Sequence, residues 1–168
     1  KKKKENEKIP LQNILMGMIA TSCSVKRYLP AGERLYAGSK VHVTRHPETK
    51  TKSNSLRKTI KLAAKPRSNK FILGQPYKVW FWYVIGEPKR EKGFRAFLRN
   101  KLGEAPVFSS RINAKSTAEN MQSLMENLGY FHTTVQGDTV NTGSYFTKAN
   151  YYAQVQPRYT LDTIEWVN

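Results

Sequence analysis

Cysteine is nearly absent from this 168-residue chain, and so are the signatures of the common enzyme classes. A single cysteine excludes an intramolecular disulfide framework and any cysteine-rich zinc module. The sequence contains no G-x-S-x-G nucleophile elbow, no phosphate-binding loop and no dinucleotide fingerprint. We therefore expect no catalytic residue, no cofactor and no metal, and we predict that the chain is not an enzyme.

Acidic residues are also scarce. The chain has 12 aspartates and glutamates against 29 lysines and arginines, which gives a formal net charge of +17. The acidic residues are scattered and form no carboxylate pair suited to general acid–base catalysis. His42 and His46 fall on a predicted strand and a predicted loop, so we do not expect them to share a metal ion. So basic a chain implies anionic surroundings, namely nucleic acid, membrane headgroups or an acidic partner.

Long apolar runs are missing as well. Residues 9–20 are mostly apolar but number only twelve, whereas a helix that spans a membrane needs about 20. This stretch follows the basic segment KKKKENEK and precedes small residues and a cysteine, which is typical of a secretory signal. We predict that residues 1–22 are a cleaved signal peptide. Their removal would take away five lysines and two glutamates and leave a net charge of +14, so the basicity belongs to the rest of the chain.

The residues Ala20-Thr21-Ser22-Cys23 resemble the end of a bacterial lipoprotein signal, in which the cysteine thiol is acylated and becomes the new N-terminus. The resemblance implies that Cys23 is lipidated and that residues 23–34 form a tether. The alternative is an isolated cysteine behind a tagged or truncated N-terminus.

Hydrophobic periodicity predicts a strand and then a helix after the tether. Residues 35–43 are rich in strand-forming side chains, and their valines alternate with a histidine. The polar segment RHPETKTKSNS that follows is predicted to be a loop. Residues 55–65 place their apolar side chains on one helical face, which predicts a helix that ends before Pro66 and is capped by Ser53 or Ser55.

Tyr77 to Ile85 is an unbroken apolar and aromatic run apart from Lys78. Periodicity does not distinguish a buried strand from a buried helix over so short a length, so both stay open. Its two tryptophans are expected in the core, with a surface for a partner or for the membrane interface as the alternative. Residues 94–101 then have helical spacing, and Gly103 is predicted to end that helix.

The segment ENMQSLMENLGYFHTTV, residues 119–135, predicts a helix that runs directly into a strand. The helix is expected to start at Ser109 or Asn113, and Ser116 to Glu119 has the spacing of a capping box. Gly129 is predicted to end it, because a left-handed backbone costs glycine least. Four apolar residues at i, i+3, i+4 and i+7 form one stripe: Met121, Leu124, Met125 and Leu128.

Two further segments predict a terminal hairpin. Residues 131–136 alternate between the two faces, residues 149–155 alternate again, and we expect the turn within 137–147. His132 is expected on the surface of this hairpin. With helices grouped between the first strand and the hairpin, the order of elements predicts an α+β fold in which helices pack on one face of a small mixed β-sheet.

Nucleic-acid binding is the alternative function. The segment KVWFWYVIGEPKREKGFRAFLRNK combines basic and aromatic residues, which is the usual footprint of such binding. Its aromatic residues form one contiguous block, however, and no DNA- or RNA-binding signature is present. A secretory signal would also separate the protein from nucleic acid, so no nucleic acid is expected as a partner. A lipoprotein domain with some other partner is a third hypothesis.

The junction Gly129-Tyr130-Phe131 and the order of elements resemble a POTRA domain, the periplasmic module of the BamA/TamA outer-membrane assembly proteins. That module has the order β-α-α-β-β, and its second helix ends in Gly-Tyr-Phe or Gly-Tyr-Tyr. The chain is similar in particular to TamL, the lipoprotein form of TamA in Bacteroidetes, over residues 23–168. Matching blocks include CSVKRYLPAGERLYAGSKV, ILGQPYKVWFWYVIG, GFRAFLRNKLGEAPV and ENLGYF.

The resemblance also implies a division into modules. Residues 35–157 would form one POTRA-like domain with an insertion, and residues 158–168 would be the first strand of a following module. Arg158 stands where the boundary between modules often has glycine. The family's C-terminal β-barrel is absent from this sequence.

The implied role is a lipid-anchored arm at the bacterial outer membrane that helps to assemble outer-membrane proteins or couples to a TamB-like partner. The absence of acidic residues directly after Cys23 favours a periplasm-facing location. A hairpin of this kind leaves an edge strand whose free N–H and C=O groups can pair with an extended client, or are merely solvated. The candidate partner-binding residues are Phe131, Thr133, Thr134, Val135 and Gln136.

Overall fold

The computed structural model of the chain describes residues 25–160 and residue 163. These residues divide into two compact units. The hairpin unit comprises residues 25–29 and 70–105, and the sheet unit comprises the remaining described residues. The expected signal peptide and Cys23 lie outside the described residues, as does most of the expected strand at 158–168.

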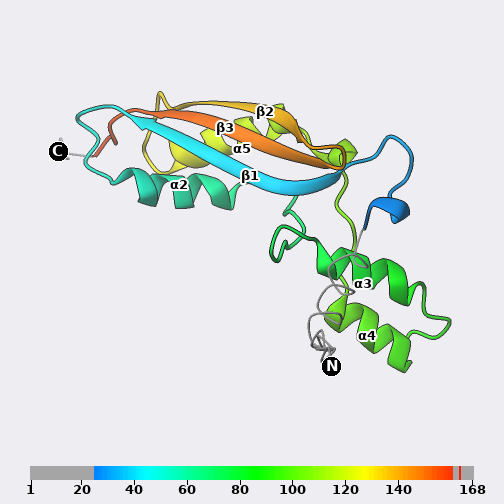
Figure 1. The fold of residues 1–168 in the computed structure, drawn as a ribbon. Helices are drawn as coiled ribbons and strands as arrows, with labels where there is room; N and C mark the ends of the chain where they lie inside the picture. Colours follow the sequence, from blue (N-terminus) through cyan, green and yellow to red (C-terminus); the bar gives the residue numbers. More distant parts are fainter. Residues whose placement is uncertain (1–24, 161–162, 164–168) are drawn as a thin grey trace, which may run out of the picture. The chain divides into compact units, whose positions relative to one another are not determined.

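Three strands form the sheet unit's β-sheet: β1 (Leu35–Arg45), β2 (Thr134–Thr142) and β3 (Phe146–Val155). Their order in space is β1-β3-β2, with β3 parallel to β1 and antiparallel to β2 (Figure 1). The sheet is therefore mixed, as the sequence predicted. The hairpin of β2 and β3 is also confirmed, and its turn lies within the expected region.

Two helices, α2 (Ser53–Leu62) and α5 (Ala114–Asn127), pack on one face of the sheet (Figure 1). Residues of β3 alternate between buried and exposed, so every second side chain enters the core between sheet and helices. The α+β fold class and the order β-α-α-β-β with an insertion agree with the prediction. The largest fully buried side chains of this core include Tyr36, Ile60, Met121, Met125, Tyr151 and Val155.

Helix α5 starts where the sequence allowed but not through the expected capping box. The Asn113 side chain accepts a hydrogen bond from Ser116 N–H at 2.9 Å and so caps the helix. Gly129 adopts a left-handed φ of 87° just after the C-terminus, as predicted. Of the predicted stripe, Leu128 departs from the core and is 38% exposed.

Helix α2 buries Leu56 and Ile60, as its periodicity predicted. Neither serine caps it, because the N-cap is Lys52, which makes no side-chain cap. Ser53 and Ser55 instead lie inside the first turn, so this part of the prediction was wrong.

The hairpin unit contains the 3₁₀-helix η1 (Val25–Tyr28) and the helices α3 (Tyr77–Ile85) and α4 (Phe94–Leu102), with α4 folding back along α3 (Figure 1). The aromatic run that periodicity left undecided is thus a helix. Gly103 follows α4 as predicted, and a Cβ at this position would lie 2.5 Å from the Arg99 carbonyl oxygen and 3.1 Å from the Trp82 Cα, so a larger residue would force the backbone to shift where α4 ends against α3. The short 3₁₀-helix η2 (Ser109–Arg111) belongs to the sheet unit.

Candidate functional site

The outer edge of β2 is the candidate site, because β3 separates β2 from β1. All nine residues of β2 pair with β3 in a continuous antiparallel register, from Thr134 opposite Gln154 to Thr142 opposite Phe146. Within residues 25–160, no other segment forms backbone hydrogen bonds with β2. The outward backbone groups of this strand are therefore available to another extended chain.

Alternate residues of β2 turn their backbone N–H and C=O groups toward this edge. Thr139 N–H donates to the Asp138 carboxylate at 2.7 Å and so points away from β3. Because these directions alternate along a strand, Val135, Gly137 and Asn141 share the outward orientation. The carboxylate thus occupies one outward donor, and the donors of the other three residues remain for a partner.

Two contacts hold β2 in place on the core. A Cβ at Gly137 would lie 2.5 Å from the carbonyl oxygen of Ala114 and 2.8 Å from the Tyr151 ring, so only glycine permits this approach of β2 to α5. Near the turn, the Thr147 hydroxyl donates to Asn141 Oδ1 at 2.9 Å. The edge is therefore a preformed strand rather than a loop that must be ordered on binding.

The structure corrects the extent of the predicted edge. Thr134, Val135 and Gln136 are the first residues of β2, as expected. Phe131, however, lies in the turn before β2 and packs its ring edge-on against Tyr159 at 5.6 Å, so its assignment to the strand was wrong.

Thr133 is also not part of the strand, because it is buried in the junction directly before β2. Residues 137–142, which were expected to lie in the turn, continue the strand instead. Their composition of Gly, Asp, Thr and Asn is poor in strand formers. Pairing with β3 holds residues 137–142 in an extended conformation. The sequence of β2 alone gives little indication that these residues form a strand.

The Gly129-Tyr130-Phe131 junction fixes the start of this edge. The Tyr130 ring is buried and its hydroxyl shares a hydrogen bond of 2.7 Å with the Thr51 hydroxyl. Gly129 O accepts a hydrogen bond from Tyr159 N–H at 2.9 Å. The junction therefore connects the end of α5 to the loop before α2 and to the chain that leaves β3.

The sheet face opposite the helices is open and largely polar. His42 and Tyr152 lie side by side on β1 and β3 and stack with their centroids 5.0 Å apart and an interplanar angle of 13°. Lys148 and Gln154 lie on the same face of β3, because they alternate with its buried residues. His42 therefore belongs to an aromatic pair on this face.

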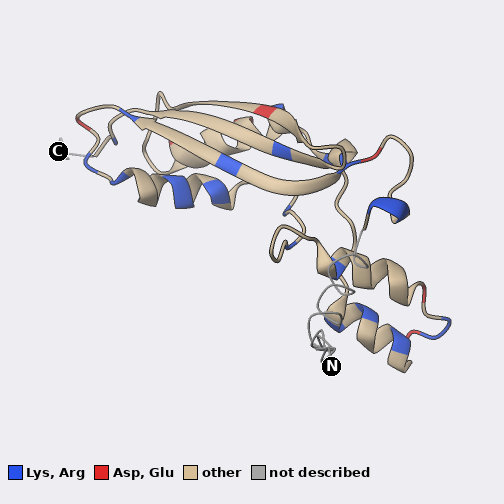
Figure 2. Cartoon of the chain, viewed as in Figure 1, with Lys and Arg blue, Asp and Glu red and all other residues tan. Residues whose placement is uncertain are grey.

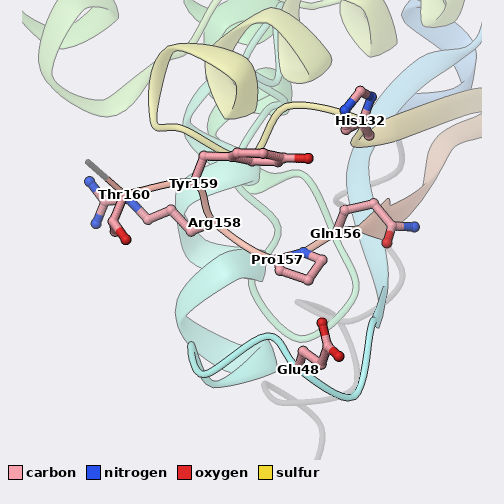
Figure 3. Close-up of a pocket in the computed structure, with 7 residues that line it drawn as sticks. All are labelled: Glu48, His132, Gln156, Pro157, Arg158, Tyr159 and Thr160. Carbon is pink, nitrogen blue, oxygen red and sulfur yellow. The ribbon is translucent and has the colours of Figure 1, made fainter. Parts of the chain in front are cut away.

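A pocket of about 600 Å³ lies beside the segment that leaves β3, and Figure 3 shows the residues that line it. It contains one carboxylate, one imidazole and one guanidinium, with His132 and Glu48 on opposite sides of the hollow. Nowhere among the residues that the structure describes do three or more His, Cys, Asp or Glu side chains gather as metal ligands. The lining residues are Glu48, His132, Gln156, Pro157, Arg158, Tyr159 and Thr160.

Two tyrosines of the core have shifted pKa values. Burial raises the pKa of Tyr36 and of Tyr151 above the ordinary value of 10.0. Both phenols are therefore neutral at physiological pH and act as packing residues of the sheet rather than as acids.

Comparisons with protein-family models, with curated proteins and with solved structures found no match. In the described part of the chain, no helix is both long enough and apolar enough to cross a membrane.

Proposed function

We propose that this chain is a POTRA-like protein-binding module of an outer-membrane protein assembly factor, and that it binds by adding a strand to the edge of β2. The observation that carries the proposal is the outer edge of this nine-residue strand, with which no other segment of residues 25–160 pairs. An exposed edge presents a row of donors and acceptors that an extended peptide matches irrespective of its side chains. Clients of varied sequence, such as unfolded outer-membrane proteins, suit this mode of binding.

The edge also has features that limit self-association. Asp138 places a carboxylate on the strand, and among the described residues it is the one charged side chain of β2. Charged residues are a common means of protecting an edge from pairing with a second copy. A cationic or neutral client strand would therefore be favoured over another β2.

The proposal further assigns residues 1–22 to a signal peptide, Cys23 to a lipid anchor, and the protein to the periplasmic side of the outer membrane. A TamB-like protein or another part of the assembly machinery is the second proposed partner. The sequence alone supports these assignments, because the residues concerned lie outside those described. The function is binding, with no catalytic step and no cofactor.

Amide hydrogen exchange with a synthetic barrel-strand peptide tests the proposal. The peptide alternates apolar and polar residues, and a control peptide contains prolines in place of its apolar residues. Bound peptide is expected to slow exchange at Val135, Gly137 and Asn141 at least tenfold, because their N–H groups face outward. Amides of Gln136 and Val140 already face β3 and should change little. Binding that leaves the outward amides fast would overturn the proposal.

A proline substitution tests the same edge by mutation. Val135→Pro removes an outward donor and leaves the pairing with β3 intact, because proline is tolerated where the N–H faces solvent. Peptide affinity is expected to fall at least tenfold, whereas Val135→Thr, which keeps the N–H, should bind as the native chain does. Equal affinity of the two variants would contradict binding at this edge.

Nucleic-acid binding is the second candidate, favoured by one observation. The stacked His42–Tyr152 pair lies on the open sheet face, and Lys40 and Lys148 lie on the neighbouring rows of β1 and β3. Stacked aromatic side chains among lysines suit single-stranded nucleic acid. Fluorescence anisotropy with a labelled single-stranded oligonucleotide separates the two functions. Binding that Tyr152→Ser abolishes and Val135→Pro leaves unchanged would favour nucleic acid.

A further inference from the structure

Helix α3 is apolar on every side, yet the part of the chain that the structure describes leaves much of it exposed. Eight of its nine residues are apolar or aromatic, with Lys78 as the one charged residue, but only Val79 is fully buried. A helix that is apolar all round normally lies in a core or in a lipid environment. Among the described residues, α3 therefore has less packing against it than a helix of this apolar composition normally has.

Helix α4 adds large aromatic side chains to the exposed surface. Phe94 is 75% exposed and Phe97 is 56% exposed, and they lie three residues apart and so on one side of the helix. On α3, Phe81 and Val84 have the same spacing and are also exposed. We call these four residues the apolar ridges of the hairpin.

The segment that carries the apolar ridges is strongly basic. Residues 77–102 contain seven lysines and arginines against two glutamates, a net charge of +5. Figure 2 shows cations in the loop between α3 and α4 and on α4, and Lys78 lies in the first turn of α3. Arg99 lies over the Trp82 ring, 4.1 Å from its centroid, so one cation also packs on an aromatic face.

The charge and the side-chain types of this surface together indicate which partner the apolar ridges contact. Aromatic side chains flanked by lysine and arginine are typical of the boundary between the acyl chains and the headgroups of a bilayer. Each helix of nine residues is only about 14 Å long, so the pair lies on such a surface and does not cross it. The excess of cations matches anionic headgroups.

We propose that the α3–α4 hairpin is a membrane-binding element, which rests its apolar ridges in the interface of a bilayer that carries anionic headgroups. This surface is separate from the β2 edge and gives the chain a contact with lipid through its own side chains.

The position of η1 is consistent with this contact. Val25 is buried, and the ring of Tyr28 stacks on Tyr83 of α3 with centroids 5.3 Å apart and an interplanar angle of 8°. Cys23 lies two residues before Val25, within about 7 Å along an extended chain. If Cys23 is acylated as proposed above, the anchor holds the hairpin at the membrane. Only this step depends on the proposed function.

Vesicle binding tests the inference without any contribution from an acyl chain. The chain from residue 23 onward, without the proposed signal peptide and carrying Cys23→Ser, is mixed with vesicles of phosphatidylcholine, alone or with phosphatidylglycerol, and binding is measured by co-sedimentation. We expect binding to the anionic vesicles that weakens with added salt, and little binding to the neutral ones. Because no peptide client is present, this result stands or falls independently of the β2 edge.

Paired charge variants locate the binding surface. Neutralising the exposed loop residues as Lys89→Gln, Arg90→Gln and Lys92→Gln removes three cations from the hairpin. Partitioning should fall about fivefold for each cation, or about a hundredfold in total. The matched control neutralises three exposed cations of α2 in the sheet unit and should change partitioning less than about threefold. The control variant carries Arg57→Gln, Lys58→Gln and Lys61→Gln.

An aromatic pair of variants completes the test. Phe94→Ser with Phe97→Ser should abolish quenching of tryptophan fluorescence by brominated acyl chains, whereas Tyr152→Ser on the open sheet face should not. These side chains are at least half exposed, so both variants should keep the native unfolding temperature. Three outcomes would overturn the inference: equal loss in the two charge variants, no binding to anionic vesicles, or a dimer that forms through the hairpin instead.

Discussion

The two units use apolar residues in opposite ways. In the sheet unit, α2 and α5 bury Ile60, Met121 and Met125 completely against the sheet. In the hairpin unit, α4 leaves Phe94 and Phe97 more than half exposed. Both units contain helices with apolar residues at helical spacing. Such spacing therefore indicates which face of a helix is apolar, but not whether the protein itself covers that face.

This difference separates the two proposed binding surfaces. The β2 edge offers backbone groups, so its binding should depend weakly on client sequence and on salt. The hairpin offers aromatic and basic side chains, so its binding should depend on their identity and on ionic strength. Each surface can thus be removed by a change that leaves the other intact.

The largest expected effect is the contrast between a core residue and a ridge residue. Ile60→Ala should lower the free energy of unfolding by about 2–5 kcal/mol, because Ile60 is fully buried between helix and sheet. Phe97→Ala should change it by less than about 0.5 kcal/mol. Urea denaturation measures both. If Phe97→Ala lowers the free energy of unfolding as much as Ile60→Ala does, Phe97 is packed like an ordinary core residue. The inference that the hairpin binds a membrane would then be contradicted.

A second prediction compares the two glycines that lie at close contacts. Gly137→Ala would force a Cβ against α5 and the Tyr151 ring, and Gly103→Ala would force one against α3. Overpacking of this kind costs about 1–3 kcal/mol.

We expect Gly137→Ala to lower the stability of the sheet unit and Gly103→Ala to accelerate amide exchange in α3 and α4 only. Native-state hydrogen exchange resolves the two responses. If Gly103→Ala accelerates exchange throughout β3 as well, the two units unfold together and the comparison between them fails.

The local sequence was sufficient to predict a helix or strand wherever the apolar periodicity of that element lies within the element itself. The apolar residues of α5, the glycine after it and the alternation in β3 predicted a helix, its end and a strand in the correct places. Together with the order of elements they predicted the mixed sheet and its covering helices. These features follow from periodicity and from backbone preference, which a short window of sequence contains.

Features that depend on distant partners were not predictable in the same way. The last six residues of β2 have turn-forming composition and are extended because β3 pairs with them. The sequence pattern places Phe131 on the same strand face as Val135. In the structure Phe131 instead lies in the turn before β2, where its ring contacts Tyr159. The aromatic run of α3 is too short and too uniformly apolar for periodicity to distinguish a helix from a strand. The solvent exposure of its side chains depends on which other segments pack against the helix, and its own sequence does not contain that information.

A third prediction concerns helix capping, where the sequence offered several candidates. Asn113→Ala should cost about 1 kcal/mol, because the side chain satisfies Ser116 N–H at the start of α5. Ser53→Ala should cost less than about 0.5 kcal/mol, because Ser53 lies inside α2 and does not cap it. Thermal unfolding of the two variants at the same pH measures the difference. Equal losses would show that the cap contributes nothing specific.

The smallest expected effect is a dependence on alkaline pH that distinguishes the enclosed core. Burial raises the pKa of Tyr36 and Tyr151 in the folded state, while the unfolded chain titrates near the ordinary value of 10.0. Above pH 10 the unfolded state therefore binds fewer protons than the folded state, and stability falls as pH rises toward the raised values. Below pH 10 this contribution is fully present.

Replacing both tyrosines, as Tyr36→Phe with Tyr151→Phe, should flatten this loss, because phenylalanine has no proton to release. Urea denaturation of the double variant and of the native chain at pH 8, 10 and 11 compares the two slopes. The two chains differ only at these two phenols, so the difference in slope isolates them. Parallel slopes would mean that the interior of the sheet unit is open to water, and its contrast with the hairpin would then be one of degree only.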